Sequence, residues 1–123
     1  MEQLNGFFVG WKKRPDPCVH LHLLKNSDVI VLAQDVDSKA IIGFITAITD
    51  HVLSAYIPLL EVLPEYQNKG IGTQLLRLML EELSTFYMID LSCDSALQPF
   101  YKKFRMQEVK GMCLRNISAI PSN

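Results

Sequence analysis

The stretch that decides the fold reads Val62-Leu63-Pro64-Glu65-Tyr66-Gln67-Asn68-Lys69-Gly70-Ile71-Gly72-Thr73. An apolar strand ends here, a polar turn follows, and a helix with one apolar face begins after Gly70. Glycine has no Cβ to keep a ligand away from the backbone, and the first N–H groups of a helix have no partner within it. The stretch therefore predicts a loop that can bind a phosphate group at a helix N-terminus.

Two common phosphate-binding loops do not fit this stretch. A Walker A loop places its lysine after the second glycine, whereas Lys69 precedes Gly70. A dinucleotide-binding fingerprint requires a third glycine, and Leu75 occupies that position. A bare Gly-x-Gly pair more often makes only a tight turn, so the flanking residues must decide.

Upstream of the loop, the hydrophobic pattern predicts an α/β domain with a strongly antiparallel first half. β-Branched runs predict a hairpin that turns at residues 35–39, followed by a third strand. Pro58 lies inside the third strand and has no N–H group, which implies a bulge or an unpaired stretch. The predicted strands cover residues 29–33, 40–49 and 52–63.

Regular structure is also expected towards both ends of the chain. The apolar spacing predicts two short helices before the hairpin, interrupted by Pro15 and Pro17. After the loop it predicts helix, strand, helix and then two closing strands around Lys110 and Gly111. The helices are predicted at residues 4–11, 19–25, 70–83 and 95–104, and the strands at residues 87–92, 106–109 and 112–117.

Length and composition are those of one compact domain, residues 1–123. The chain has 49% hydrophobic residues, 20% charged residues and a formal net charge of −1, so a disordered chain and a nucleic-acid-binding protein are both disfavoured. No apolar run approaches the ~18 residues of a membrane span, so no membrane interaction is expected. Three widely spaced cysteines show neither a disulfide framework nor a zinc pattern, so we expect a cytoplasmic protein without a metal.

The residues around the loop resemble a known family. The run Gln67 to Gly72 fits the Q/R-x-x-G-x-G/A signature of the GCN5-related N-acetyltransferases (GNAT), and Val62 to Tyr66 resembles their V-x-P-E-Y lead-in. The run Asp90 to Phe104 resembles the family's segment ending in A-x-x-F-Y-x-x-x-G-F. Among familiar members it is most similar there to the arylalkylamine acetyltransferases, which carry a C-x-D-A-L-x-P-F-Y run. The resemblance covers residues 29–117. It implies the acyl-coenzyme A N-acyltransferase fold, a mixed and mostly antiparallel sheet flanked by helices, here without the usual first strand.

By this resemblance the chain binds acetyl-coenzyme A as its acetyl donor. In the family the pyrophosphate lies on the loop amides, and the pantetheine arm pairs with main-chain groups where the third strand splays from the next one. The thioester carbonyl would accept an N–H group near Val62. The cofactor-binding residues that the resemblance implies are Val62, Leu63, Gln67, Asn68, Lys69, Gly70, Ile71, Gly72 and Thr73.

Acetyl transfer to an amine requires proton transfers at two places. Tyr101 matches the family's general acid, which protonates the coenzyme A sulfur; its alternative role is to pack in a short aromatic helix. Tyr56 occupies the position at which several members of the family carry a Glu or His as the general base. Glu61 is the one carboxylate on an apolar strand, which suggests substrate binding or water-mediated base catalysis, with a surface position or an ion pair as the alternative. Arg105 replaces the family's cap glycine, so strain is expected there.

Two functions are compatible with these residues. The first is an enzyme that moves an acetyl group from acetyl-coenzyme A to a primary amine of a small molecule or peptide, by direct attack in a ternary complex. The alternative is an acyl-coenzyme A-binding module that has lost catalysis and acts as a sensor or partner subunit. Because no strand precedes Leu4, the run 29–33 is expected to be an exposed sheet edge, covered in a homodimer or by the N-terminal arm.

Overall fold

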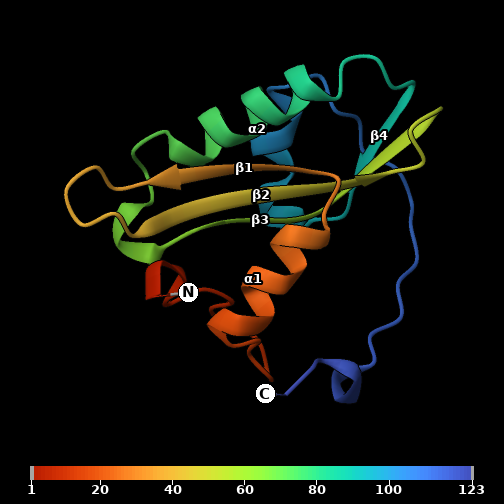
Figure 1. Ribbon diagram of the computed structural model, residues 1–123. Helices are drawn as coiled ribbons and strands as arrows, with labels where there is room; N and C mark the ends of the chain where they lie inside the picture. Colours follow the sequence, from red (N-terminus) through yellow and green to blue (C-terminus); the bar gives the residue numbers. More distant parts are fainter. Residues whose placement is uncertain (1, 123) are drawn as a thin grey trace.

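The computed structural model describes residues 2–122 and contains one four-stranded sheet with helices on both faces (Figure 1). In sheet order the strands are β1 Val29–Gln34, β2 Ile41–Thr49, β3 Ser54–Val62 and β4 Met88–Leu91. The helices are α1 Pro17–Asn26, α2 Ile71–Glu82 and α3 Gln98–Lys102, and the 3-10 turns are η1 Glu2–Leu4, η2 Pro64–Tyr66, η3 Ser95–Leu97 and η4 Ile117–Ala119. The predicted fold class is confirmed. Within the described residues no helix is long and apolar enough to cross a membrane.

The sheet is antiparallel from β1 to β3, and β4 runs parallel to β3. The predicted hairpin turn at residues 35–39 is confirmed, and the Asp35 carboxylate accepts N–H groups of the turn. The irregularity predicted at Pro58 is also confirmed. The register of β2 against β3 shifts between Thr46 and Ile48, opposite the Ile57–Pro58 pair, because a proline cannot donate to the ladder.

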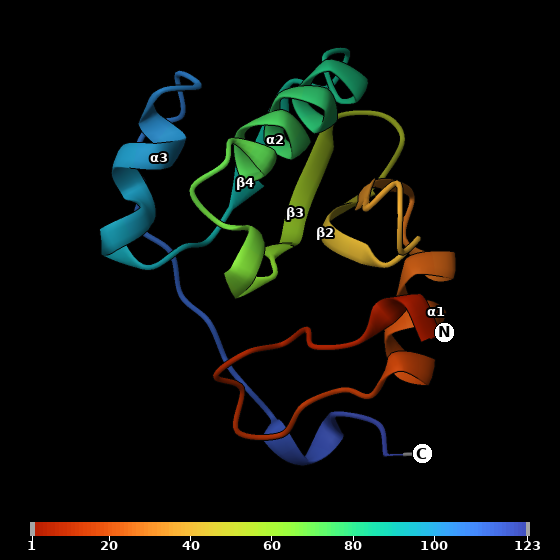
Figure 2. The ribbon, with the colours of Figure 1, turned by 90° about the vertical axis from the view of Figure 1, so that its left-hand side faces the viewer.

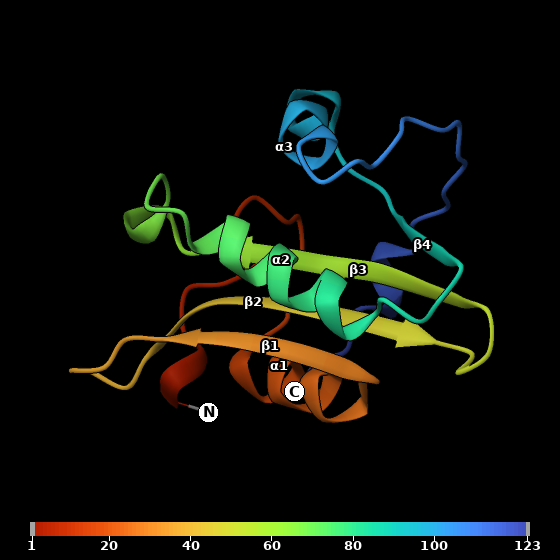
Figure 3. The ribbon, with the colours of Figure 1, turned by 90° about the horizontal axis from the view of Figure 1, so that it is seen from above.

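Two apolar clusters cover the two faces of the sheet, with α2 on one face and α1 on the other (Figures 1 and 3). β2 lies between them, so its first seven residues are all buried. The α2-face cluster consists of Ile45, Ala47, Ala55, Ile57, Leu75, Leu76, Met79 and Leu83. The α1-face cluster consists of Leu4, Phe7, Phe8, Leu24, Ile41, Ile42, Phe44 and Leu63. β2 therefore contributes buried side chains to both clusters.

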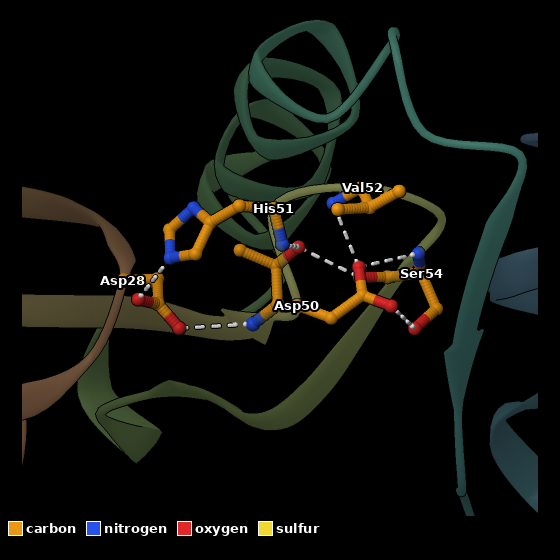
Figure 4. Close-up of polar contacts among 6 residues, drawn as sticks. Asp28, Asp50, His51, Val52 and Ser54 are labelled. Atoms are coloured by element: carbon orange, nitrogen blue, oxygen red, sulfur yellow. Dashed lines mark hydrogen bonds and ion pairs between the residues drawn. The ribbon is translucent and has the colours of Figure 1, made fainter.

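The turn from β2 to β3 is held by carboxylates (Figure 4). Asp50 Oδ1 accepts the N–H groups of Val52, Leu53 and Ser54 at 2.9, 2.8 and 3.1 Å, and these bonds lower the pKa of Asp50. Asp28, which follows α1, accepts the Thr49 N–H at 2.9 Å and pairs with His51 at 3.2 Å. The turn thus fixes the start of β3 relative to α1.

The helix predicted at residues 4–11 is wrong. The N-terminal arm, residues 2–16, is irregular after η1. Gly6, Phe8 and Gly10 have φ angles of 90°, 63° and 85°, which a right-handed helix cannot contain. Leu4, Phe7 and Phe8 are nonetheless buried. Their spacing in the sequence therefore indicates that they pack in the core, but not that they lie on a helix. The start of the arm lies against α1 and β2 instead of the free edge of β1, so the prediction that it covers that edge is also wrong.

The two closing strands predicted at residues 106–109 and 112–117 do not form in the single chain. Residues 106–116 have no regular structure, and Ile117 begins η4. A strand-like composition needs a neighbouring strand, and none pairs with this segment among residues 2–122. The strain expected at Arg105 is confirmed, because its φ is 67°.

Candidate active site

β3 and β4 separate halfway along β3. Their parallel ladder covers only Ser54–Ile57 against Met88–Leu91. From Pro58 onwards β3 pairs with β2 alone among the strands of the described chain, because Pro58 has no N–H group and β4 ends at Leu91. The result is an opening between the two strands that exposes the backbone of the second half of β3.

The backbone of Val62 points into this opening. The Leu63 N–H donates to the Ile42 carbonyl on β2 at 2.9 Å, and successive residues of a strand point their N–H groups to opposite sides. The N–H and carbonyl of Val62 therefore face away from β2. The Val62 carbonyl accepts the Gln67 side-chain amide at 2.9 Å, which ties the glycine loop to the end of β3.

The loop before α2 is arched by two residues in the left-handed region. Asn68 has a φ of 63° and Gly70 a φ of 84°. Gly70 is the N-cap of α2, has no side-chain cap, and has nothing within 4 Å of the position that a Cβ would occupy. The first helical bond is donated by Gln74 to the Gly70 carbonyl, so the N–H groups of residues 71–73 are available for an anion. The Lys69 ammonium lies over the Tyr66 ring at 5.5 Å.

Three elements converge where the loop meets the strand opening. A Cβ on Gly72 would lie 3.8 Å from the Phe100 ring of α3 and 3.8 Å from a Val62 methyl group of β3. Phe100 packs edge-on against Tyr101, with ring centroids 5.0 Å apart. The glycine loop, the open strand and the aromatic pair are thus neighbours, although about 40 residues of chain separate Val62 from Tyr101 in the sequence.

Tyr101 lies in a partly buried position beside Cys93. Burial and, to a lesser extent, the nearby Cys93 thiol raise the pKa of Tyr101 to about 12. The phenol therefore keeps its proton throughout the neutral range. Both side chains line a cleft of about 1020 Å³ beyond β4. This arrangement can donate a hydrogen bond or a proton to an atom placed next to α3.

Glu61 uses both carboxylate oxygens within the protein. Oε1 accepts the Phe8 N–H at 2.9 Å and Oε2 accepts the Val9 N–H at 3.3 Å. Arg14 holds the same arm by donating to the Phe7 carbonyl at 2.7 and 3.1 Å. The ion pair that was the alternative role of Glu61 is absent from the contacts of residues 2–122. The residue anchors the N-terminal arm next to the end of β3.

Tyr56 is not arranged as a base. Its hydroxyl donates to the Ser92 hydroxyl at 3.0 Å, across the β3–β4 ladder. Asp90 is the ladder partner of Tyr56, and its side chain is exposed. Together these polar groups mark the side of the strand opening that faces away from α2.

Two contacts of the site could not be predicted from the sequence. The pairing of Glu61 with the arm joins residues 53 positions apart, and no local pattern signals it. Cys93 lies near Tyr101, but a lone cysteine carries no motif. The described residues contain no group of three or more side chains that could hold a metal ion.

Comparison with known proteins gives a consistent family. Residues 25–104 match the model of the acetyltransferase (GNAT) domain. A crystal structure of a proposed acetyltransferase from Deinococcus radiodurans R1 superposes with a TM-score of 0.91 at 41% identity, over 98% of this chain and 86% of that one. An uncharacterised N-acetyltransferase of Pyropia yezoensis is 31% identical over 111 residues, which cover 85% of this chain; the chain spans 64% of that relative's length.

One more neighbour was solved with a ligand. Arabidopsis thaliana Naa50, in complex with the bisubstrate analogue CoA-Ac-MVNAL, has a TM-score of 0.58 and 26% identity. The match covers 78% of this chain and 68% of that one.

Proposed function

The chain belongs to the acetyltransferase (GNAT) domain family, and we propose that it transfers the acetyl group of acetyl-coenzyme A to a primary amine. The observation that carries this proposal is the convergence of the open strand, the glycine loop and α3 around Gly72. The open strand supplies an N–H donor for the thioester oxygen, and the glycine loop supplies N–H groups for the phosphates. α3 supplies a proton donor for the departing sulfur.

The acetyl donor fits the loop and the strand opening. We assign the pyrophosphate to the N–H groups of residues 70–73, where the left-handed Gly70 leaves open space and the start of α2 adds positive potential. Val62 supplies the N–H for the thioester oxygen. Leu63 is not assigned such a role, because its N–H and its carbonyl are both bonded within the protein, to Ile42 and Tyr66. Gln67, Asn68 and Lys69 shape the loop around this cradle.

Tyr101 is assigned as the proton donor to sulfur. Full transfer from a phenol with a pKa of about 12 to a thiolate whose thiol has a pKa near 8.5 is uphill by about 5 kcal/mol, so Tyr101 acts first as a hydrogen-bond donor. As the carbon–sulfur bond breaks, charge develops on sulfur and the donated hydrogen bond strengthens. The raised pKa also prevents loss of the proton before the reaction.

The acceptor amine is assigned to the side of the opening that faces away from α2. An alkylammonium is about 3.4 pKa units from neutral at pH 7, so losing its proton costs about 4.6 kcal/mol without help. Asp90 and Glu61 carry negative charge on this side, which favours a cationic amine of a small molecule or a peptide N-terminus. Because both oxygens of Glu61 already accept N–H groups, we assign Glu61 to shaping the acceptor pocket and leave the base to water.

Two measurements on the same preparation test this proposal. Calorimetry with acetyl-coenzyme A is expected to show binding, and release of free thiol is expected when a panel of small amines and short peptides is added. Acetylated product in an amount equal to the released thiol completes the result. Binding without turnover on any amine would support the alternative, a non-catalytic acyl-coenzyme A-binding module. That alternative is favoured by Tyr56, which donates to Ser92 where a base is common in the family. Absence of binding would reject both functions.

A further inference from the structure

The N-terminal arm makes a tight turn, residues 8–11, against the end of β3. The Trp11 N–H donates to the Phe8 carbonyl at 3.2 Å, and Gly10, the third residue of the turn, has a φ of 85°. Both oxygens of the Glu61 carboxylate hold the turn, because they accept its first two N–H groups at 2.9 and 3.3 Å. Hydrogen bonds to a charged group are stronger than neutral ones, so the turn is held firmly on β3.

The turn begins with a strained residue. Phe8 has a φ of 63°, in the left-handed region, where a bulky side chain is an outlier. Its buried ring packs edge-on against the rings of Trp11 and His20, with centroids 5.0 Å apart in each case. Strained backbone persists where the surroundings over-determine it, and such residues cluster at functional sites. The strain at Phe8 therefore indicates a function for the turn that it begins.

The turn leaves two apolar side chains in contact with solvent. Trp11 is 43% exposed and Val9 is 52% exposed, although Phe7 and Phe8 of the same arm are buried. Because the indole packs on the fixed Phe8 ring, its exposed surface is held in place before any ligand binds. A large apolar surface that is already ordered binds an apolar group with little further loss of conformational entropy. The turn thus offers a preorganised apolar surface.

This surface lies on the side of the strand opening to which we assign the acceptor amine. Val62 packs against the α2-face cluster, and side chains alternate along a strand, so the Glu61 side chain points to the α1 face. The turn that Glu61 holds is therefore one side-chain length away from the backbone of β3 next to Val62. Figures 2 and 3 show the arm, in red, extending past β3 towards α3 on the side of the sheet away from α2. An amine that approaches the thioester from this side lies against the turn.

The charges beside the turn restrict what the acceptor carries besides its amine. Lys12, Lys13 and Arg14 follow Trp11 directly, and none of the three takes part in an ion pair among residues 2–122. Lys13 and Arg14 donate to backbone carbonyls, which do not neutralise their positive charges. Charges within about 8 Å of one another interact at physiological salt, so a second ammonium group next to Trp11 would be repelled. An acceptor with one amine and an apolar chain fits this surface, and a diamine does not.

We propose that Trp11 determines the acceptor specificity and selects primary monoamines that carry an apolar chain. The chain of the acceptor lies on the indole and on Val9, and its single amine reaches the thioester beside Val62. Trp11 moves no proton in this assignment, so its contribution is to binding and to kcat/KM ratios between amines. The inference rests on the proposed acetyl transfer and names the class of amine that the reaction takes.

Thiol release with hexylamine, ethylamine, 1,6-diaminohexane and 6-aminohexanoate tests this assignment. Full burial of one CH₂ group gives about fourfold in affinity, and contact on one side gives about half of that free energy, or about twofold. The four additional CH₂ groups of hexylamine are therefore expected to raise kcat/KM roughly 15-fold over ethylamine. The second ammonium group of 1,6-diaminohexane is expected to remove most of this advantage.

Variants of the turn identify the side chain responsible. Trp11→Ala is expected to reduce the hexylamine-to-ethylamine ratio to below about threefold, with the Kd for acetyl-coenzyme A and the circular dichroism unchanged. Trp11→Phe keeps an aromatic ring and is expected to retain most of the ratio. Val9→Ala is expected to lower the ratio about twofold. Its matched control is Val52→Ala, because Val52 is 81% exposed at the opposite end of β3 and is expected to leave the ratio unchanged.

Fluorescence provides a readout that does not need turnover, because Trp11 is the one tryptophan of the chain. In the presence of coenzyme A, hexylamine is expected to shift the emission to shorter wavelength, and ethylamine at the same concentration is expected to leave it unchanged. This shift without acetylation of any amine would support the assignment of Trp11 and reject the proposed reaction. Neither shift nor acetylation would reject both.

Two results would overturn the role of Trp11 and leave acetyl transfer standing. The first is acetylation with equal kcat/KM values for hexylamine and ethylamine, or with a ratio that Trp11→Ala does not change. The second is a preference for 6-aminohexanoate over hexylamine, which would assign the turn to an anionic end group held by Lys12, Lys13 and Arg14 in place of an apolar chain.

Discussion

The two faces of the sheet differ in the residues and elements that form their buried clusters. The α2 face is aliphatic and made of regular elements, and its cluster residues are drawn from β2, β3 and α2 with Leu83 at the helix end. The α1 face is aromatic and partly irregular: the arm supplies Phe7 and Phe8, whose rings pack against His20 and Phe44 at centroid distances of 5.0 to 6.1 Å. The His20 and Phe44 rings lie 4.4 Å from each other.

The two faces also differ in their buried polar groups. His20 is 1% exposed and neither ring nitrogen has a hydrogen-bond partner within the described residues; the Thr46 hydroxyl, also buried, has none there either. Thr46 alternates with Ile45 and Ala47 along β2, so it lies on the α1 face. Buried polar atoms without partners cost stability. Among the described residues, both of these unpartnered side chains thus lie on the face proposed for the acceptor, and none lies on the face to which we assign the acetyl donor.

The largest expected effect is on the α3 side of the site. Tyr101→Phe is expected to lower kcat by about 100-fold or more, because general acid catalysis typically contributes 10²–10⁴-fold, while the Kd for acetyl-coenzyme A stays within about twofold. Steady-state kinetics and calorimetry measure the two quantities. Tyr87→Phe is the control, since Tyr87 is an exposed tyrosine outside α3. Unchanged turnover in Tyr101→Phe would remove Tyr101 from the mechanism.

The second effect concerns His20 and the stability of the α1 face in acid. Burial lowers the pKa of His20 from 6.5 to about 4. Between these values the unfolded chain binds a proton that the folded chain does not, so the free energy of unfolding falls as the pH drops from 6.5 to 4, by about 3 kcal/mol in total. Urea unfolding at pH 7 and at pH 4.5 measures the loss.

A leucine at position 20 separates this cause from general acid effects. His20→Leu is expected to remove most of the loss, because the replacement leaves no buried group to be protonated and no unsatisfied nitrogen. His22→Leu is the matched control, since His22 is exposed on the same helix and should keep the full acid sensitivity. Equal acid sensitivity in the two variants would contradict the assignment to His20.

The extent of sequence-based prediction also differs between regions. The hairpin, α2 and the break at Pro58 follow from local rules, since β-branched runs, helical periodicity and a missing N–H act within a few residues. The arm and the segment after Arg105 were predicted as regular and are not, because their apolar residues are placed by partners far along the chain, or by none in a single copy. Glu61 was singled out by its unusual setting, but its partners at Phe8 and Val9 could not be inferred.

The third effect tests the role of Glu61. Glu61→Gln replaces one accepting oxygen by an NH₂ group that faces a backbone N–H, which loses one charged hydrogen bond worth about 1.5 kcal/mol. If the arm forms a wall of the acceptor pocket, the KM for the amine rises roughly tenfold while kcat and the Kd for acetyl-coenzyme A change little. A fall in kcat at constant KM would instead identify Glu61 as the base. Glu65→Gln is the control, because Glu65 is exposed in η2.

The smallest effect compares two glycines with nearly the same backbone φ angle. Gly70 precedes α2, and Gly10 lies in the N-terminal arm. Gly70 has a φ of 84° and Gly10 a φ of 85°, and neither has a heavy atom within 4 Å of its Cβ position. Alanine at either position adopts the left-handed region at a cost of about 1 kcal/mol, so Gly70→Ala and Gly10→Ala are expected to lower the free energy of unfolding equally. Only Gly70→Ala is expected to raise the Kd for acetyl-coenzyme A, because its Cβ enters the space assigned to the pyrophosphate. Urea unfolding and calorimetry of both variants isolate the ligand effect from the strain. Equal Kd values for the two variants would place the phosphate elsewhere than on the α2 loop.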